Sequence, residues 1–417
     1  MFKLSSTSIL GVNVIGHISG ETGLGEAVRG NIKAMQATGI PYSLQNFKQD
    51  LERNLDHTCT DYITKNFYPI NYIHTSPGEV SLVREQLGFD YFKDQYNIAF
   101  WAWELLKFPD CWYSAFDLFD EIWTPSNYCV EALAAVSPIP VIKIPHSIDL
   151  PIPRLDRASL GLPQDKFIFL FMFDFGSNFE RKNPLATLEA FKQAFGTSNQ
   201  DVLLVIKFRP HPHLLQEVEY FKEQVGDYPS IHVIEGDMTK TEVNSLIYNC
   251  DCYVSLHRSE GFGLTMAEAM FYGKPVIATP YSANIDFMNV SNSFPVKYQL
   301  ITTNQNYGSY PAGSIWADPD IDHAASLMQY VFYNYQEARQ IGLRASEDTK
   351  SLLSPQTNGI RIRNRLEYIM KWMGKTSSTP VSRFHKLQTE KDVFYSQSQV
   401  WKKTAQEMRR ELKNHES

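Results

Sequence analysis

Glu260 and Glu268 stand eight residues apart, in a stretch whose other residues could build an anion site around them. A carboxylate on a helix can accept hydrogen bonds from both hydroxyls of a ribose, and we assign that role to Glu268. Glu260 precedes the helix on a loop. If the anion site holds phosphates, Glu260 would contact the chemical group that is bonded to them. Two glutamates at this spacing also occur by chance on solvated faces, so the surrounding elements must decide between the two interpretations.

Those elements are predicted by the residues on either side of the pair. The apolar run 252–256 predicts a buried strand, two glycines predict a tight turn, and 264–272 predicts a helix that Gly273 ends. A second strand is predicted at 276–278. The first N–H groups of a helix lack partners and attract anions, so a diphosphate would fit here. The predicted contacts are Gly261, Phe262, Gly263, Leu264 and Thr265.

As a whole, the run 251–278 resembles the Glu-x7-Glu signature of glycosyltransferase family 4, the group 1 glycosyltransferases. The resemblance implies an α/β chain with the GT-B fold, in which two Rossmann-like domains face each other across a cleft. It also implies retaining, metal-independent transfer of a hexosyl unit from a nucleoside diphosphate sugar. Glu260 would bind sugar hydroxyls and steady developing positive charge. We expect both glutamates to face a solvent-filled cleft, so that neither is needed for folding.

Two further segments are assigned to the donor by the same resemblance. A glycine-rich turn precedes a predicted helix at 25–37, and in family 4 such a loop faces the donor phosphates. Residues 22–29 are similar to the form found in one bacterial branch, which implies Gly23 and Gly25 as donor or acceptor contacts. Arg181 and Lys182 follow the buried strand predicted at 166–173. The forked guanidinium of Arg181 and the compact ammonium of Lys182 are suited to bind two phosphates. Without that context they would be a solvated basic pair.

Other candidate positions have more than one interpretation. The loop 235–238, with Met238, lies where related enzymes hold the nucleotide base. Family members often place a histidine where this chain has Glu104, which either orients an acceptor hydroxyl or caps a turn. His74 is better explained as a packed strand-end histidine than as a catalyst. Asp318 and Asp320 match a metal motif only superficially, because a helix predicted at 323–335 follows and capping explains them.

Composition limits the remaining classes. The 417 residues suggest about two or three domains. The net charge of −7 excludes a strong basic bias toward nucleic acid. The five cysteines lack Cys-x-x-Cys spacing, and no apolar run reaches the length of a membrane span of about 18 residues. We therefore expect a cytoplasmic protein, and peripheral association with the inner face of a membrane stays open.

The predicted domain organisation follows alternating strand and helix patterns. An N-terminal acceptor domain spans 1–148, and a proline-rich linker leads to a nucleotide-sugar domain at 149–354. The resemblance also implies that a helix at 355–373 returns to the first domain. Residues 374–417 predict a linker and a helical tail, with 384–416 as a candidate partner helix.

The sequence thus favours hexosyl transfer to a glycan or lipid-linked acceptor, in polysaccharide or glycolipid biosynthesis. GDP-mannose is favoured as donor only by branch resemblance. The first alternative is a nucleotide-sugar epimerase or a phosphorylase of the same fold. The second is a non-enzymatic scaffold that uses the C-terminal helix.

Overall fold

The computed structural model describes residues 10–376, apart from 48–53, 55, 64 and 198. Gly11–Arg363 forms one compact unit that contains both main sheets, and the part of the last helix from Asn364 onward belongs to a second unit. The predicted tail and partner helix at 384–416 lie outside the described residues. Among the described residues, no helix is long and apolar enough to cross a membrane.

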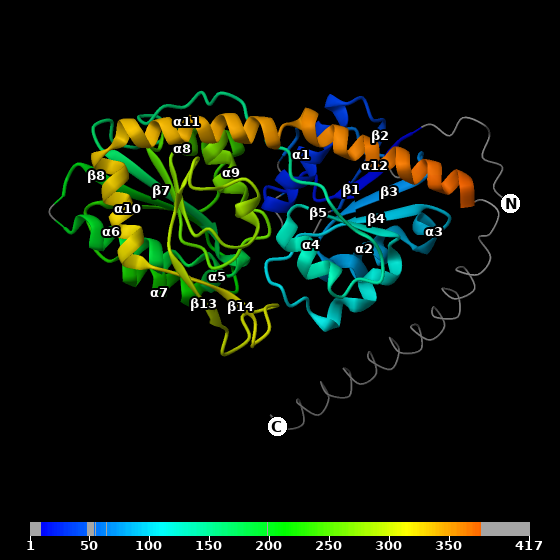
Figure 1. Cartoon of the computed structure of the whole chain (residues 1–417), viewed down its shortest axis with the longest axis horizontal. Coiled ribbons are helices and arrows are strands. Elements are labelled where there is room, and N and C mark those ends of the chain that lie inside the picture. Colours follow the sequence, from blue (N-terminus) through cyan, green and yellow to red (C-terminus); the bar gives the residue numbers. More distant parts are fainter. Residues whose placement is uncertain (1–9, 48–53, 55, 64, 198, 377–417) are drawn as a thin grey trace, which may run out of the picture. The chain divides into compact units, whose positions relative to one another are not determined.

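The first sheet has six parallel strands in the order β2-β1-β3-β4-β5-β6. Its strands are β1 (Val12–Gly16), β2 (Tyr42–Asn46), β3 (Ile70–His74), β4 (Tyr96–Phe100), β5 (Glu121–Thr124) and β6 (Val141–Lys143). The connecting helices are α1 (Gly23–Ala37), η1 (Pro77–Glu79), α2 (Val80–Leu87), α3 (Phe89–Phe92), η2 (Asp110–Leu118) and α4 (Asn127–Ala134), and Figure 1 shows them in blue to cyan.

The second sheet also has six parallel strands, in the order β12-β11-β10-β7-β8-β9. Its strands are β7 (Phe167–Asp174), β8 (Val202–Arg209), β9 (Ile231–Glu235), β10 (Cys252–Ser255), β11 (Val276–Ala278) and β12 (Phe294–Pro295). The helices are η3 (Phe175–Ser177), α5 (Phe179–Lys182), α6 (Pro184–Phe195), α7 (Leu215–Val225), α8 (Lys240–Asn249), α9 (Leu264–Phe271), η4 (Ser282–Asp286), α10 (Ile321–Tyr333), α11 (Tyr335–Leu352) and α12 (Pro355–Thr376). An antiparallel hairpin, β13 (Tyr298–Thr302) with β14 (Ile315–Pro319), separates β12 from α10.

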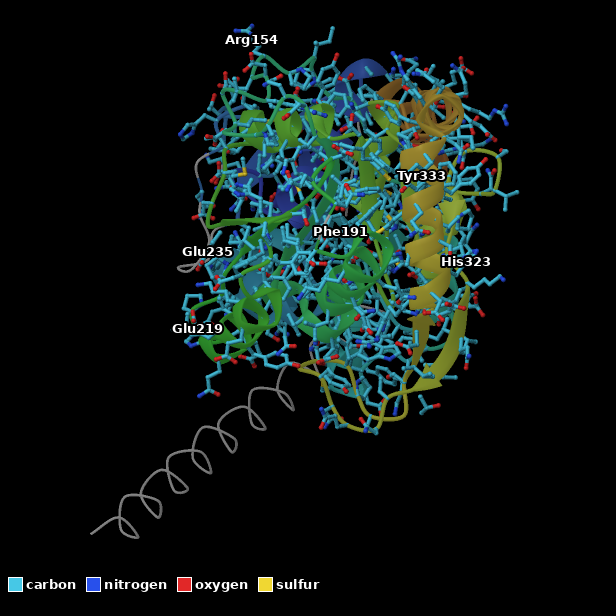
Figure 2. The ribbon with its side chains drawn as sticks, turned by 90° about the vertical axis from the view of Figure 1, so that its left-hand side faces the viewer. Arg154, Phe191, Glu219, Glu235, His323 and Tyr333 are labelled. Atoms are coloured by element: carbon cyan, nitrogen blue, oxygen red, sulfur yellow. The ribbon has the colours of Figure 1, made fainter. Side chains whose placement is uncertain are left out.

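Strand β7 is apolar along its length because helices cover both faces of its sheet. Its odd-numbered phenylalanines, 169 to 173, pack with residues of α6, α7 and α10. Its even-numbered apolar residues, 168 to 172, pack with α8, α9 and α11. Figure 2 shows Phe191 of α6 inside the molecule, whereas Glu219 and Glu235 lie at its margin. Each fully buried phenylalanine contributes roughly 1.5–3 kcal/mol to stability, so this core holds β7 in place.

Most predicted elements are present within a few residues of their expected bounds, and the differences have local causes. Helix α1 begins at Gly23 instead of residue 25, because the Thr22 side chain accepts from Gly25 N and caps the helix. Helix α10 begins at Ile321, and Asp320 caps it by accepting from His323 N at 2.9 Å, which confirms the capping interpretation for this residue. For Asp318 the interpretation is wrong, because this residue lies on β14 and pairs with Arg258 at 3.3 Å. Helix α11 and the hairpin were not predicted. The predicted boundaries at 148, 354 and 373 stay predictions.

Candidate functional site

Three predicted site residues meet beyond the carboxyl ends of β7 and β10. Arg181 and Lys182 lie on the short helix α5, whose start is capped when the Asn178 side chain accepts from Arg181 N at 3.0 Å. Glu260 lies on the loop between β10 and α9. Lys182 Nζ is 2.5 Å from Glu260 Oε1, and Arg181 Nη1 is 3.2 Å from Oε2. The structure therefore brings the basic pair and the first glutamate into one ionic cluster.

This cluster is buried, which sets the charge of Glu260. The side chain of Glu260 is 10 % exposed and that of Arg181 is 3 % exposed. Burial acts to raise the pKa of Glu260, but the charges of Lys182 and Arg181 outweigh it and lower that pKa to about 2. Glu260 is therefore a fixed anion at neutral pH.

Arg181 is already bonded within the protein. Its guanidinium donates to the carbonyl oxygens of Ser259 and Ser177, each at 2.8 Å, besides its contact with Glu260. The side chain of Lys182 is 20 % exposed, so it is the more accessible cation of the pair. Arg181 thus ties the β10–α9 loop to the β7–α5 loop, and Lys182 is the cation better placed to meet an anion.

Glu104 joins the cluster from the loop that follows β4. Its Oε1 lies 3.7 Å from Arg181 Nη2, and its Oε2 accepts from the hydroxyl of Tyr310 at 3.0 Å. Its side chain is 23 % exposed, more than those of Arg181 and Glu260. Sequence reasoning missed Tyr310, because it lies in the irregular connection of the hairpin, where no periodic pattern indicates burial.

Glu268 lies in a second ionic cluster, on α9. Lys240 Nζ is 2.6 Å from Glu268 Oε1 and 3.3 Å from Glu26 Oε2, and Glu26 also pairs with Arg29 at 2.6 Å. Burial raises the pKa of Glu268, and Lys240 offsets this only in part. Sequence reasoning missed Lys240, although a lysine at the first position of a helix opposes the helix dipole and is therefore a signal of another role.

The expectation that both glutamates face a solvent-filled cleft is wrong. The side chain of Glu268 is 4 % exposed and that of Glu260 is 10 % exposed, and each carries an ion pair with lysine. Removal of Glu260 would take the carboxylate away from the buried Arg181 guanidinium, which is costly, whereas Lys240 would keep Glu26 as a partner if Glu268 were removed. Glu260 therefore contributes to stability in the ligand-free protein.

The predicted contacts at the start of α9 divide into backbone and side-chain positions. Gly263 has φ +90°, and a Cβ there would lie 2.5 Å from Met266 Cε, so the turn requires glycine. Phe262 is 5 % exposed, and its ring lies 4.7 Å from that of His146, so its side chain belongs to the core. Leu264 and Thr265 are partly exposed in the first turn.

Gly261 also has a structural role, because its carbonyl oxygen accepts from Ser126 Oγ at 3.0 Å. Of the two glycines predicted at the start of α1, Gly25 packs so closely on the Gly20 carbonyl that a side chain would overlap it. Gly23 borders open space, where a Cβ would meet no atom within 4 Å among the described residues. Gly23 is thus the one of this pair with room for a ligand beside it.

The remaining candidates are not part of either ionic cluster. Met238 is partly buried against the core beside α8 and α9. His74 is fully buried and stacks on Phe100 with centroids 4.2 Å apart, and burial holds its pKa well below the usual range, as for a packed strand-end histidine. No group of three or more His, Cys, Asp or Glu side chains within the described part of the chain could hold a metal ion. Independence of metal stays a prediction.

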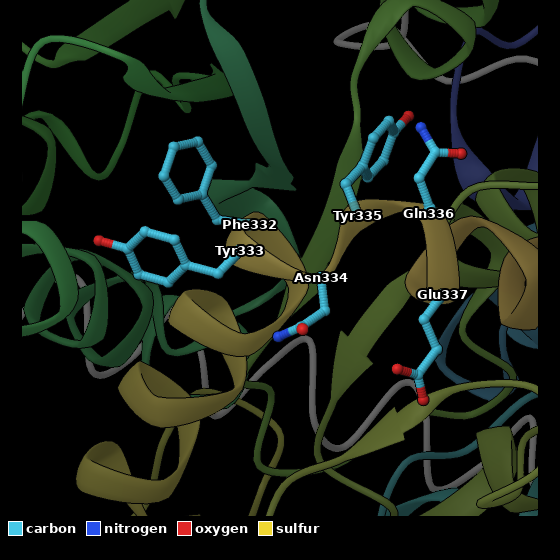
Figure 3. Close-up of a pocket in the computed structure, with 6 residues that line it drawn as sticks. All are labelled: Phe332, Tyr333, Asn334, Tyr335, Gln336 and Glu337. Atoms are coloured by element: carbon cyan, nitrogen blue, oxygen red, sulfur yellow. The ribbon is translucent and has the colours of Figure 1, made fainter.

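A pocket of about 380 Å³ lies at the turn between α10 and α11 and is lined by 332–337 (Figure 3). Tyr333 there is 72 % exposed, and the close-up shows Phe332 and Tyr333 on one side of the turn and Glu337 on the other. The pocket contains none of the predicted site residues. It gives no indication of chemistry.

Comparison with known proteins places this geometry in context. Residues 154–290 match the family model described as glycosyl transferases group 1. No curated protein matches the sequence. The structure is similar to HepE of Anabaena in complex with UDP and glucose, with 12 % identity, a TM-score of 0.62, and coverage of 86 % of this chain and 100 % of that one.

Two other solved structures give the same result. Sucrose-phosphate synthase of Thermosynechococcus elongatus has 16 % identity and a TM-score of 0.61, with 86 % of this chain and 99 % of that one covered. A glycosyltransferase of Rickettsia africae has 14 % identity and a TM-score of 0.58, with 86 % and 98 % covered. The chain therefore has the GT-B fold, and its segment 154–290, which carries Arg181, Lys182, Glu260 and Glu268, matches the group 1 glycosyl transferases.

Proposed function

We propose that this protein is a retaining glycosyltransferase. It moves a hexosyl unit from a nucleoside diphosphate sugar to a glycan or lipid-linked acceptor, in the synthesis of a polysaccharide or glycolipid. The observation that carries the proposal is the cluster of Arg181, Lys182 and Glu260 beside the start of α9, inside the segment that matches the group 1 family.

The cluster suits departure of a diphosphate from a sugar. As that bond breaks, negative charge grows on the diphosphate and positive charge on the sugar ring. The exposed part of Lys182 and the N–H groups of the first turn of α9 would stabilise the diphosphate. Because the pKa of Glu260 is about 2, this carboxylate cannot act as a general acid at neutral pH. It would instead accept hydrogen bonds from sugar hydroxyls and stabilise the positive ring.

Glu268 would hold the ribose in this scheme. Its Oε1 is bonded to Lys240, so ribose hydroxyls would share the carboxylate with that lysine or displace it. Glu26 also pairs with Lys240, so the lysine would keep one carboxylate partner in either case. Nucleotide binding at Glu268 is thus compatible with the buried charges that surround it.

The donor base and sugar belong to the proposal as well. HepE of Anabaena has been solved with UDP and with UDP-glucose, and this similarity favours a uridine nucleotide. Resemblance to one bacterial branch favours GDP-mannose instead. If the acceptor is lipid-linked, we also propose that the protein associates peripherally with the inner face of a membrane, where such an acceptor lies.

Thermal denaturation with GDP, UDP, dTDP and ADP tests the donor site first. A ligand that binds only the folded state at 100 times its Kd adds about 2.7 kcal/mol of stability, so the preferred nucleotide should raise the melting temperature most. The matching nucleotide sugar is then incubated with glycan and lipid-linked acceptors, and NMR of the product reports the anomeric configuration.

Retained configuration in a transferred hexose supports the proposal. An inverted product would contradict the retaining mechanism. An epimerised nucleotide sugar, or phosphate-dependent cleavage of a glycan, would identify the epimerase or phosphorylase. Absence of stabilisation by all four nucleotides would remove the donor site itself.

A further inference from the structure

The β13–β14 hairpin lies outside the segment that matches the family model, yet it contacts the ionic cluster. Ala317 N donates to Arg258 O at 2.9 Å, and the Arg258 guanidinium lies 5.5 Å from the centre of the Trp316 ring. Arg258 Nη2 is also 3.3 Å from Asp318 Oδ1. Strand β14 therefore holds the chain two residues before Glu260.

The connection between β13 and β14 carries Tyr310 into the cluster. Tyr310 is 6 % exposed, and its ring centre lies 5.8 Å from the Arg181 guanidinium and 5.3 Å from the Trp103 ring. Its hydroxyl donates to Glu104 Oε2 at 3.0 Å. Burial raises the pKa of Tyr310, so the hydroxyl stays protonated and remains a donor at neutral pH.

This contact fixes a carboxylate that would otherwise be free to turn. Glu104 is 3.7 Å from Arg181, too far for a direct hydrogen bond, so Arg181 alone does not hold its orientation. Glu104 is the most exposed of the four charged side chains in the cluster, at 23 % against 20 % for Lys182, 10 % for Glu260 and 3 % for Arg181. It is therefore the member of the cluster best placed to meet a second substrate.

We propose that Tyr310 is a positioning residue for the acceptor: by donating to Glu104 it aims that carboxylate so that it can accept a hydrogen bond from the incoming acceptor hydroxyl. This inference rests on the proposed glycosyl transfer and assigns the hairpin to the acceptor side of the site. Lys182 and the first turn of α9 would contact the donor. Tyr310 would therefore act on transfer and have no direct effect on donor binding.

The test separates transfer from donor hydrolysis in Tyr310→Phe, which removes one oxygen and keeps the ring. Transfer to the acceptor should fall about tenfold in kcat, the scale for loss of one hydrogen bond to a charged group. Hydrolysis of the nucleotide sugar without acceptor, and the affinity for free nucleoside diphosphate, should change less than about twofold, because neither uses Glu104.

Tyr307→Phe is the matched control. Tyr307 lies in the same connection, and the described residues provide no hydrogen bond to its hydroxyl, so transfer should be unchanged. In a Glu104→Ala background, Tyr310→Phe should have little further effect, since the carboxylate that Tyr310 orients is already absent. Glu104→Ala alone should lower transfer much more than hydrolysis, which provides the test if Tyr310→Phe does not fold.

Unchanged transfer in Tyr310→Phe, or an equal fall in transfer and hydrolysis, would overturn the inference. So would additive effects of the two substitutions. Assays of the wild-type enzyme test the proposed function separately. If the wild type transfers a sugar from none of the nucleotide sugars, the proposed function is wrong, and so is the positioning role of Tyr310.

Discussion

Replacement of Glu260 by glutamine should destabilise the ligand-free protein and yet spare binding of a free nucleoside diphosphate. Glutamine keeps the shape of the side chain but removes the negative charge that Lys182 and Arg181 face at 2.5 Å and 3.2 Å. Two cations would then lie together in a site where only 3 % of the Arg181 side chain is exposed.

The magnitude follows from the pKa of Glu260. Its fall from 4.5 to about 2 favours the charged form by roughly 3 kcal/mol. This agrees with the range of about 3–5 kcal/mol for loss of one partner of a buried ion pair. Because the pKa is lowered on folding, the contribution is complete above pH 4.5 and is lost as the pH falls toward 2.

Urea unfolding at pH 7 measures the change, with Glu189→Gln as the control. Glu189 is exposed on α6, so that substitution should change stability by less than about 0.5 kcal/mol. Calorimetry of Glu260→Gln should show nucleoside diphosphate affinity equal to or above that of the wild type, because Lys182 no longer has a competing carboxylate. Turnover should fall. Loss of nucleotide binding in a folded Glu260→Gln variant would refute the assignment of Glu260 to the sugar.

Lys182→Ala should weaken nucleoside diphosphate binding by about 1.5–3 kcal/mol, the range for charged hydrogen bonds, and unchanged affinity by calorimetry would remove Lys182 from the donor site. Glu268→Gln should weaken nucleotide sugar and free nucleoside diphosphate equally, because both contain the ribose; a loss confined to the nucleotide sugar would contradict this. Burial lowers the pKa of His146 to about 3 and that of His257 to about 4, so both stay neutral when folded and the unfolded chain binds protons first as pH falls below 6.5. The free energy of unfolding should therefore drop by about 1.4 kcal/mol per histidine between pH 7.5 and 5.5, and urea midpoints that do not change would show these histidines to be accessible.

The architecture of each half could be predicted from the sequence because it depends on local patterns. Apolar runs such as 252–256 and 166–173 match strands buried on both faces, since each lies between two layers of helices. Asp320 was recognisable as a cap because the capping hydrogen bond joins residues only three positions apart in the sequence. The grouping of Arg181, Lys182 and Glu260 was predicted for a related reason: each follows a parallel strand of one sheet, and the carboxyl ends of such strands share an edge.

Contacts between residues far apart in the chain were decided only by the tertiary structure. Glu268 meets Lys240 and Glu26, and Glu104 meets Tyr310, across 206 positions in the latter case. No periodicity encodes such pairs, because they depend on how separate elements pack. The same packing turned two carboxylates expected to face solvent into buried partners of lysine. The sequence by itself could therefore predict which residues carry charge to the site, whereas their burial, and hence their pKa values and their contribution to stability, followed only from the fold.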